Sequence, residues 1–140
     1  MTEDLTGRLL NLSSPYVERL GLRLLSATPD EVTAALTVDP DAHFHPWNAV
    51  HGGVYCAIVE TLATLGAQLS AIPAGKLASG IENHTSFLRQ VRGGELWARA
   101  VPVSRGRQLH LWDVRITDEQ DRVVATGRVR LALLDPPASA

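Results

Sequence analysis

The segment that most limits what this chain can fold into is residues 53–70, GVYCAIVETLATLGAQLS, which is long, free of proline and apolar around most of its helical circumference. A helix with this pattern is buried on nearly all sides. We therefore expect one long helix that the rest of the chain encloses.

The enclosing elements are expected to be β-strands. In residues 31–38, EVTAALTV, apolar side chains alternate with smaller or polar ones, which is the period-two pattern of a half-buried strand. Residues 21–27 are expected to pair with this strand as a hairpin. Three strands rich in Val, Leu, Trp and Arg are then expected as a meander, preceded by one further strand; the four cover residues 79–90, 95–103, 107–117 and 122–134.

A single helix wrapped by a strongly curved antiparallel sheet buries both the helix and one face of the sheet. The sequence therefore predicts an α+β fold with its central helix at about residues 53–70, in a single domain that spans residues 1–140. The ends, residues 1–4 and 136–140, are expected to be flexible. Residues 5–12, LTGRLLNL, are a candidate short amphipathic helix.

A stripe of polar residues interrupts the apolar surface of the predicted helix. Glu60, Thr64 and Gln68 are spaced i, i+4 and i+8, so they share one face. Because an ionised carboxylate is costly to bury without partners, Glu60 must face a cleft, receive hydrogen bonds or be held neutral. Each option suits a catalytic group. The stripe equally fits the solvated side of the helix, and the helical pattern alone does not separate the two interpretations.

His51-Gly52-Gly53 comes immediately before the predicted helix. Two glycines let a ligand approach the backbone closely, and the amides of a first helical turn are unsatisfied donors at the positive end of the helix dipole. Such amides can stabilise an oxyanion. A Gly-Gly pair alone is also typical of a flexible hinge, but the lone acid eight residues after Gly52 favours the catalytic interpretation.

The spacing between these two features constrains how they could act together. Eight helical residues rise about 12 Å, which a glutamate side chain does not span. If both groups act on one carbonyl, the Gly52 amide of one chain and Glu60 of another must meet across an interface. This predicts an obligate dimer with two symmetric shared sites.

Composition excludes several other classes of protein. A net charge of −2 gives no global basic field of the kind that attracts nucleic acids. The single cysteine, Cys56, cannot form an internal disulfide and is expected to be a small core residue. The first twenty residues resemble neither a secretory signal nor a membrane span. We therefore expect a cytoplasmic protein with no nucleic-acid partner and no membrane partner.

The histidines do not form a recognisable metal motif. His43 and His45 lie close together in the triplet HFH, but no carboxylate or cysteine completes a ligand spacing around them. The remaining three are scattered along the chain, at His51, His84 and His110. No metal site is expected.

The run HPWNAVHGGV followed by Glu60 resembles the hotdog-fold thioesterases of the 4-hydroxybenzoyl-CoA and phenylacetyl-CoA type. Later segments, ENHTSFLRQVR, RAVPVSRGR and ITDEQDRVVATGRVRLALL, are similar to that family's strands in the same order, so the resemblance covers residues 21–134. Glutamate as the acid is similar to the Arthrobacter-type branch. The resemblance implies a hotdog fold and hydrolysis of acyl-coenzyme A thioesters.

The resemblance also implies roles for individual residues. Glu60 would be the nucleophile or the general base, the Gly52 amide would polarise the thioester carbonyl, and Thr64 would position Glu60 or water. His51 would support the loop. His45 departs from the family, whose members commonly have Asn or Gln there as a polar partner of the carbonyl or water. Histidine can also donate a hydrogen bond, and Asn48 is an alternative for the same role.

Further residues are candidates for binding the substrate. Coenzyme A carries phosphates, and arginines at strand ends or turns could bind them, although for any one arginine a solvated position or a rim ion pair is more common. Gly53 and Trp47 adjoin the catalytic loop, and Trp47 is a candidate wall of an acyl pocket. The candidate phosphate-binding residues are Arg89, Ser104, Arg105 and Arg107. No cofactor is expected, because coenzyme A is part of the substrate.

The resemblance suggests an aromatic or medium-chain acyl group and a homotetramer built from two dimers. Two other functions stay open at this point. One is a hotdog hydratase or dehydratase, which needs a histidine and an acid around the acyl Cα and Cβ. The other is a noncatalytic acyl-coenzyme A-binding module, which would keep the pocket and the arginines without needing Glu60.

Overall fold

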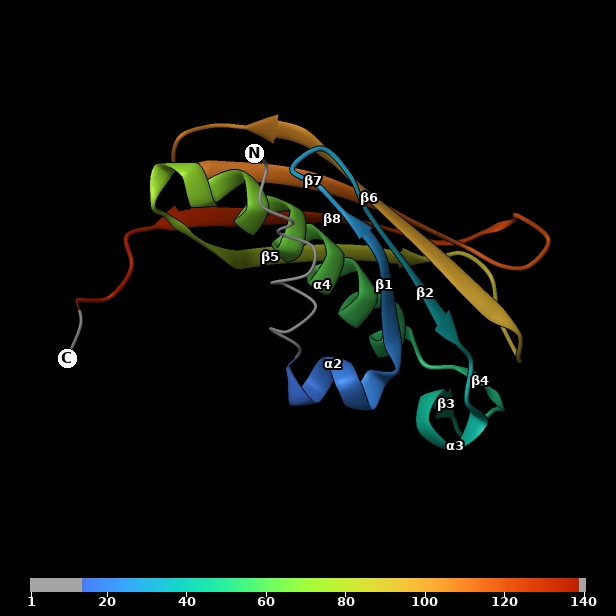
Figure 1. The fold of residues 1–140 in the computed structure, drawn as a ribbon. Coiled ribbons are helices and arrows are strands. Elements are labelled where there is room, and N and C mark those ends of the chain that lie inside the picture. Colours follow the sequence, from blue (N-terminus) through green and yellow to red (C-terminus); the bar gives the residue numbers. More distant parts are fainter. Residues whose placement is uncertain (1–13, 139–140) are drawn as a thin grey trace.

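The computed structural model describes residues 14–138 as one long helix lying across a six-stranded antiparallel sheet (Figure 1). Strands follow one another in the sheet in the order β1-β2-β6-β7-β8-β5. The six strands are β1 (Leu22–Ala27), β2 (Val32–Thr37), β5 (Leu77–Phe87), β6 (Glu95–Arg105), β7 (Leu109–Thr117) and β8 (Val123–Leu134). The predicted hairpin of the first two strands and the predicted meander of the last three are both confirmed.

The long helix is α4, Gly52–Ala71, which continues into the 3-10 turn η1, Ile72–Ala74. It confirms the helix expected over residues 53–70. The stretch 52–74 is long and apolar enough to cross a membrane by length and composition alone. A buried core helix has the same character, and here the inner face of the sheet covers α4 (Figure 1).

The core is formed where α4 meets the inner-facing side chains of four strands. Alternate residues of each strand are buried, as expected for a sheet that packs on one face only. On the four strands these residues are Val32, Ala34 and Leu36; Leu96, Ala98 and Ala100; Trp112, Val114 and Ile116; and Ala125, Val129 and Leu131. Burying each larger side chain stabilises the fold by about 1.5–3 kcal/mol.

Strand β5 differs from the expectation in its ends, and the sequence did not predict its neighbour in the sheet. The strand predicted over residues 79–90 runs over Leu77–Phe87, and it ends where the N–H groups of Leu88 and Arg89 both donate to the Val124 carbonyl. It pairs with β8 and not with β6, the next strand along the chain. Strand β5 therefore forms an edge of the sheet and leaves one side of its backbone unpaired within the described chain.

Short elements that the periodicity did not predict flank the start of α4. They are α2 (Pro15–Leu20), α3 (Pro40–His43) and the two-residue strands β3 (Phe44–His45) and β4 (Ala49–Val50). Ser14 caps α2 through its side chain, and Asp39 caps α3 in the same way. The amphipathic helix expected over residues 5–12 lies outside the described residues.

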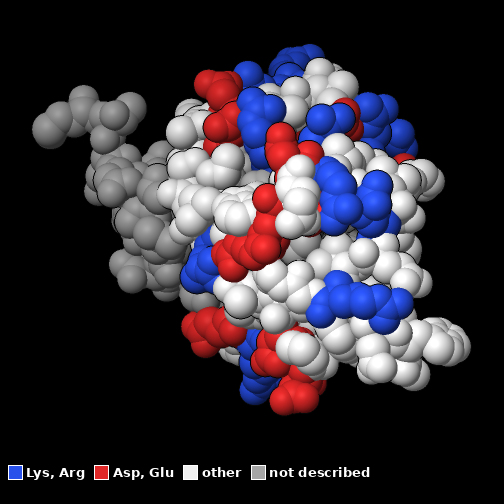
Figure 2. All heavy atoms as spheres, turned by 90° about the vertical axis from the view of Figure 1, so that its right-hand side faces the viewer, with Lys and Arg blue, Asp and Glu red and all other residues white. Residues whose placement is uncertain are grey.

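The charged side chains of the sheet alternate in sign. On the face shown in Figure 2, basic and acidic residues interleave. The sheet also carries ion pairs, among them Arg128–Asp113 between β8 and β7 and Arg99–Glu31 between β6 and the residue before β2. Exposed pairs of this kind contribute at most about 1 kcal/mol each, so the helix–sheet core is the main source of stability.

Close packing of α4 against the sheet depends on Gly66. A Cβ at this position would lie 2.3 Å from Cη2 of Trp112, whose ring is fully buried and cannot move aside. We predict that Gly66→Ala lowers the free energy of unfolding by about 1–3 kcal/mol, measured by denaturant titration. Gly93→Ala is the control, because nothing lies within 4 Å of its Cβ. Equal stability of the two variants would contradict this packing.

The β7–β8 turn depends on Asp118. Its buried carboxylate accepts the backbone N–H groups of Gln120 and Arg122 and the Arg122 guanidinium, and the Arg122 side chain holds the pKa of Asp118 below its ordinary value. A lowered carboxyl pKa contributes stability above the unfolded-state value of about 4, and this is lost as the pH falls through the folded-state value.

We therefore predict that Asp118→Asn reduces the free energy of unfolding at pH 7 and that the difference from the original protein shrinks as the pH falls below about 4. Denaturant unfolding measured from pH 7 to pH 3 checks this. Asp121→Asn in the same turn is the control, because Asn also tolerates the left-handed φ of 58° at that position. A loss of stability with Asp118→Asn that does not depend on pH would refute the prediction.

Candidate active site

Glu60 lies between α4 and the edge strand β5. Its side chain is partly buried, and the Thr64 hydroxyl donates to Oε1 at 3.3 Å while Asn83 Nδ2 donates to Oε2 at 3.4 Å. Among the described residues, no Lys, Arg or His forms an ion pair with this carboxylate. Its partners are neutral donors, so its charge is not neutralised by a structural ion pair.

Gln68, the third residue of the polar stripe, has a structural role. Its Oε1 accepts the Ala78 N–H at 2.9 Å and its Nε2 donates to the Lys76 carbonyl at 3.2 Å. The side chain thus satisfies backbone groups where the chain enters β5. The polar stripe therefore has two parts. Glu60 receives hydrogen bonds from a hydroxyl and an amide, whereas Gln68 holds the start of β5 through hydrogen bonds to its backbone.

The first turn of α4 leaves one amide without a partner. His51 is the N-cap, and its Nδ1 accepts the Gly53 N–H at 2.8 Å. The Val54 N–H donates to the His51 carbonyl. The Gly52 N–H has no hydrogen-bond partner among the described residues. Of the two glycine amides, that of Gly52 is therefore the one open to an external acceptor.

An aromatic side chain from β5 covers the same glycine. A Cβ at Gly52 would lie 2.4 Å from Cε2 of Phe87, so glycine allows the ring to approach the helix start. Phe87 remains 54% exposed and also contacts the ring of Tyr55. Sequence reasoning missed Phe87, which is the last residue of β5, the strand that follows α4 in the chain.

The loop before the helix holds three of the predicted site residues. His45 Nδ1 accepts the Trp47 N–H at 3.1 Å, and the two rings meet edge to face at 5.5 Å. Trp47 is 77% exposed, and Asn48 adopts a left-handed φ of 57°. Arg92, a further residue that sequence reasoning did not connect with this loop, donates to the carbonyls of Trp47 and Asn48.

A cleft of about 540 Å³ opens beside this loop and the first turn of α4. His43 forms part of its wall and is buried, with Nε2 near the Leu20 carbonyl at 2.7 Å and Nδ1 accepting the Asp39 N–H. The lining residues come from α2, from the α3–β3 region and from the helix start: Tyr16, Arg19, Leu20, Ala42, His43, Phe44, His51, Gly53 and Val54. The cleft therefore adjoins the Gly52–Gly53 backbone.

Tyr55 lies on the same turn but is unsuited to proton transfer. Its ring is buried and its hydroxyl has no partner among the described residues. Burial, followed by the negative charge of Asp118, raises the pKa of Tyr55 to about 12. The phenol therefore stays protonated at physiological pH and is not a base.

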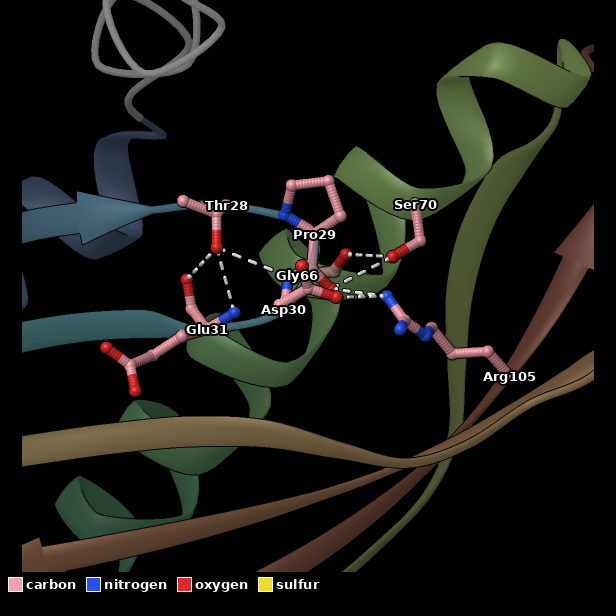
Figure 3. A network of polar contacts seen from close by, with 7 residues as sticks. All are labelled: Thr28, Pro29, Asp30, Glu31, Gly66, Ser70 and Arg105. Carbon is pink, nitrogen blue, oxygen red and sulfur yellow. Dashed lines mark hydrogen bonds and ion pairs between the residues drawn. The ribbon is translucent and has the colours of Figure 1, made fainter.

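Arg105 lies at the opposite end of α4, where it forms structural contacts (Figure 3). Its guanidinium donates to the Pro29 carbonyl at 3.0 Å and pairs with Asp30 at 2.9 Å. The Ser70 hydroxyl, on the last turns of α4, donates to the same Pro29 carbonyl and to Gly66 (Figure 3). These contacts fix the β1–β2 turn to the helix and occupy part of the Arg105 side chain.

A second cleft, of about 510 Å³, lies at this end. Arg105 and Arg107 both line it, and Ser104 lines a neighbouring depression with Arg107. His110 forms the buried part of the wall, where burial and then the charge of Arg105 lower its pKa, so the ring is neutral at physiological pH. Arg107 forms no ion pair with another described residue and is free to bind an anion.

The structure thus divides the predicted site residues into separate groups. His45, Trp47, Asn48, His51, Gly52 and Gly53 gather at the start of α4, and the exposed Arg89 comes two residues after Phe87, whose ring lies over Gly52. Glu60 and Thr64 lie at the middle of the helix. Ser104, Arg105 and Arg107 lie beside its C-terminal end. Over residues 14–138, no cluster of three or more His, Cys, Asp or Glu side chains could hold a metal ion.

Comparison with known proteins identifies the family of this chain. The family model of the thioesterase superfamily matches residues 48–125, which is more than half of the chain. A Mycobacterium tuberculosis protein that is named as an esterase, Rv1847, is 41% identical over 128 residues, covering 90% of this chain and 91% of the relative. The proofreading thioesterase EntH of Cronobacter sakazakii is 33% identical over 132 residues, covering 93% and 95%.

Solved structures show the same fold. The Mycobacterium tuberculosis protein Rv1847/MT1895 superposes with a TM-score of 0.86 at 39% identity, covering 89% of this chain and all of that one. The thioesterase HI1161 of Haemophilus influenzae superposes with a TM-score of 0.87 at 28% identity, covering 99% and 95%. The chain therefore belongs to the thioesterase superfamily and has its hotdog fold.

Proposed function

We propose that this protein hydrolyses acyl-coenzyme A thioesters to a free acid and coenzyme A, with Glu60 as the catalytic carboxylate. The observation that carries the proposal is the state of Glu60, a partly buried carboxylate that has neutral hydrogen-bond donors and no cationic partner among the described residues. Such a carboxylate keeps its basicity and nucleophilicity for a substrate. Membership of the thioesterase superfamily supports the reaction class.

The Gly52 amide supplies the second requirement of the reaction. As the thioester carbonyl is attacked, negative charge develops on its oxygen, and a free N–H at the positive end of a helix dipole stabilises that charge. Glu60 either attacks the carbonyl carbon, giving an anhydride that water cleaves, or removes a proton from an attacking water. In both routes the carbon–sulfur bond breaks and coenzyme A leaves as its thiolate.

We further propose that each site is shared between two chains. Gly52 and Glu60 of one helix are separated by about 12 Å along its axis, so they cannot act on the same carbonyl. The unpaired edge of β5 offers a place for a second copy, since an exposed edge strand readily pairs with another chain. Apolar side chains exposed along β5 favour the same contact: Leu77, Ile81 and Phe87. A tetramer of two such dimers remains the expectation from the family.

The arginines at the far end of α4 fit the phosphates of coenzyme A. Ser70, beside Arg105, is ten residues from Glu60, or about 15 Å along the helix. The pantetheine arm separates the thioester from the phosphates, so phosphate contacts are needed at a distance from the carboxylate. Arg107 at the second cleft and Arg89 near the helix start are the two candidates without ion pairs to described residues.

The first cleft is the candidate acyl site. It adjoins the Gly53 backbone, and its walls include the apolar Leu20, Phe44 and Val54. Its volume of about 540 Å³ suits an aromatic or medium-chain acyl group. His45 and Asn48 remain the candidate polar partners at its edge, and a cytoplasmic location remains the expectation from the sequence.

One prediction of the proposed function concerns the carboxylate of Glu60. Glu60→Gln keeps the shape and the Thr64 contact but removes the charge, and we expect the rate of thiol release to fall by roughly 10²- to 10⁴-fold. The measurement is thiol release from 4-hydroxybenzoyl, phenylacetyl, hexanoyl and palmitoyl thioesters of coenzyme A. Glu18→Gln on α2 is the control for loss of a carboxylate elsewhere.

Other outcomes of this panel separate the alternatives. Full activity in Glu60→Gln would remove Glu60 from the reaction. Binding of the thioesters without turnover by the original protein would identify a binding module, and a change in enoyl-coenzyme A absorbance would identify a hydratase. Glu60→Gln must keep the oligomeric state of the original protein for the comparison to hold.

Another prediction of the proposed function concerns the Gly52 amide. Gly52 is the first helical residue, and His51 has φ −64° and ψ 137°, a conformation compatible with a following proline. Gly52→Pro therefore removes the N–H from a position that tolerates proline, while Gly52→Ala adds the same Cβ next to Phe87 and keeps the N–H. We expect Gly52→Pro to lower kcat roughly 10²- to 10³-fold relative to Gly52→Ala. Equal kcat in the two variants would exclude the Gly52 amide as the oxyanion donor.

A further inference from the structure

The carboxylate of Glu60 lies against β5 at a glycine that is next to a β-bulge. A Cβ at Gly80 would lie 2.1 Å from Glu60 Oε1, so only a glycine lets the carboxylate reach the strand backbone. The pairing of β5 with β8 shifts register between Gly80 and Glu82, which marks a β-bulge at the same place. Bulges often redirect side chains next to active sites. Here the bulge lies between the glycine that makes room for Glu60 and the next inward-facing polar residue, Asn83.

Asn83 connects this strand to the helix at the carboxylate. Its Nδ2 donates to Glu60 Oε2 at 3.4 Å and to the Cys56 carbonyl, one helical turn earlier, at 3.0 Å. The Thr85 hydroxyl donates to Asn83 Oδ1 at 2.6 Å. Because the Cys56 carbonyl can only accept, the NH₂ group must point toward the helix, which leaves Oδ1 to accept from the Thr85 hydroxyl.

Thr85 in turn depends on a glycine in the neighbouring strand. Thr85 pairs with Gly127 of β8, and a Cβ at Gly127 would lie 2.7 Å from the Thr85 hydroxyl oxygen. The glycine therefore leaves room for the hydroxyl on the inner face of the sheet. A continuous set of contacts runs from Gly127 through Thr85 and Asn83 to Glu60.

We propose that Asn83 is a positioning residue for Glu60, held in orientation by Thr85 and assisted by the space at Gly80. With Thr64 on Oε1 and Asn83 on Oε2, each carboxylate oxygen has one neutral donor and keeps a further lone pair for water or substrate. Contacts of 3.3 and 3.4 Å are long, as is common for catalytic hydrogen bonds before substrate binds. The inference rests on the proposed function of Glu60.

Two substitutions at Asn83 test this role. Asn83→Leu removes the donor at similar volume, and we expect kcat to fall about tenfold or more, with KM changed less than about twofold, because the contact is made to the catalytic group. Asn83→Asp places a like charge beside Glu60, and we expect the acidic limb of the kcat profile to move up by about one pH unit or more. Thr85→Val should reproduce part of the Asn83→Leu effect.

The control is His84→Gln, since His84 alternates with Asn83 and faces the outer side of the sheet. A second readout does not need activity: the titration of the Glu60 carboxyl carbon, followed by ¹³C NMR and assigned with Glu60→Gln. Its midpoint should rise in Asn83→Asp by about one pH unit and stay unchanged in His84→Gln.

The outcomes separate this inference from the proposed function. If the original protein hydrolyses no thioester, the proposed function fails, while the NMR titration still decides whether Asn83 acts on Glu60. If Glu60→Gln is inactive but both Asn83 variants match His84→Gln in kcat, pH profile and carboxyl titration, the positioning role is overturned.

Discussion

The packing of α4 against the inner face of the sheet is the interaction on which the rest of this structure depends. The helix has so much apolar surface that it must be enclosed, and the sheet reaches it only where small residues permit close contact, as Gly66 does opposite Trp112. With the helix fixed in this position, its two ends and its middle each meet a different part of the chain. Its first turn meets the α3–β4 loop, its middle meets β5, and its last turns meet the β1–β2 turn.

Glu60 interrupts the apolar surface of this helix, and its carboxylate has no cationic partner among the described residues. Strand β5 lies at the sheet edge, so the space next to Glu60 is bounded by one strand with neutral donors and not by a second layer of core. A cation at this place would hold the charge in a structural ion pair. In the mechanism that we propose, a single chain cannot complete the site, because Gly52 lies about 12 Å from Glu60 along the helix. We therefore propose that catalysis requires a dimer.

Local sequence patterns predicted the elements well because each depends on the periodicity of its own side chains. The apolar circumference of residues 53–70 predicted α4 to within a residue at each end, alternation predicted β2, and residue content with short connections predicted the strands of the meander. The fold family followed from the motif around His51-Gly52-Gly53 and Glu60. Pairing between β5 and β8 did not follow, because nothing in the periodicity of a strand identifies its neighbour. The ion pair of Arg105 with Asp30 was missed for the same reason, since the two residues are far apart in sequence. Asn83 was also missed, although a polar residue facing inward on a predicted strand is a signal that could have been used.

The central claim is that the Gly52 amide of one chain and Glu60 of its partner act on the same thioester. The most direct measurement is the activity of a mixed dimer, made by co-expressing Glu60→Gln and Gly52→Pro chains with different affinity tags and purifying on both. Each parent alone lacks one half of every site, whereas the mixed dimer contains one complete site and one doubly defective site. The account predicts about half of the original activity per mixed dimer. Activity no higher than that of the two parents would show that each site is built within one chain and would contradict the account.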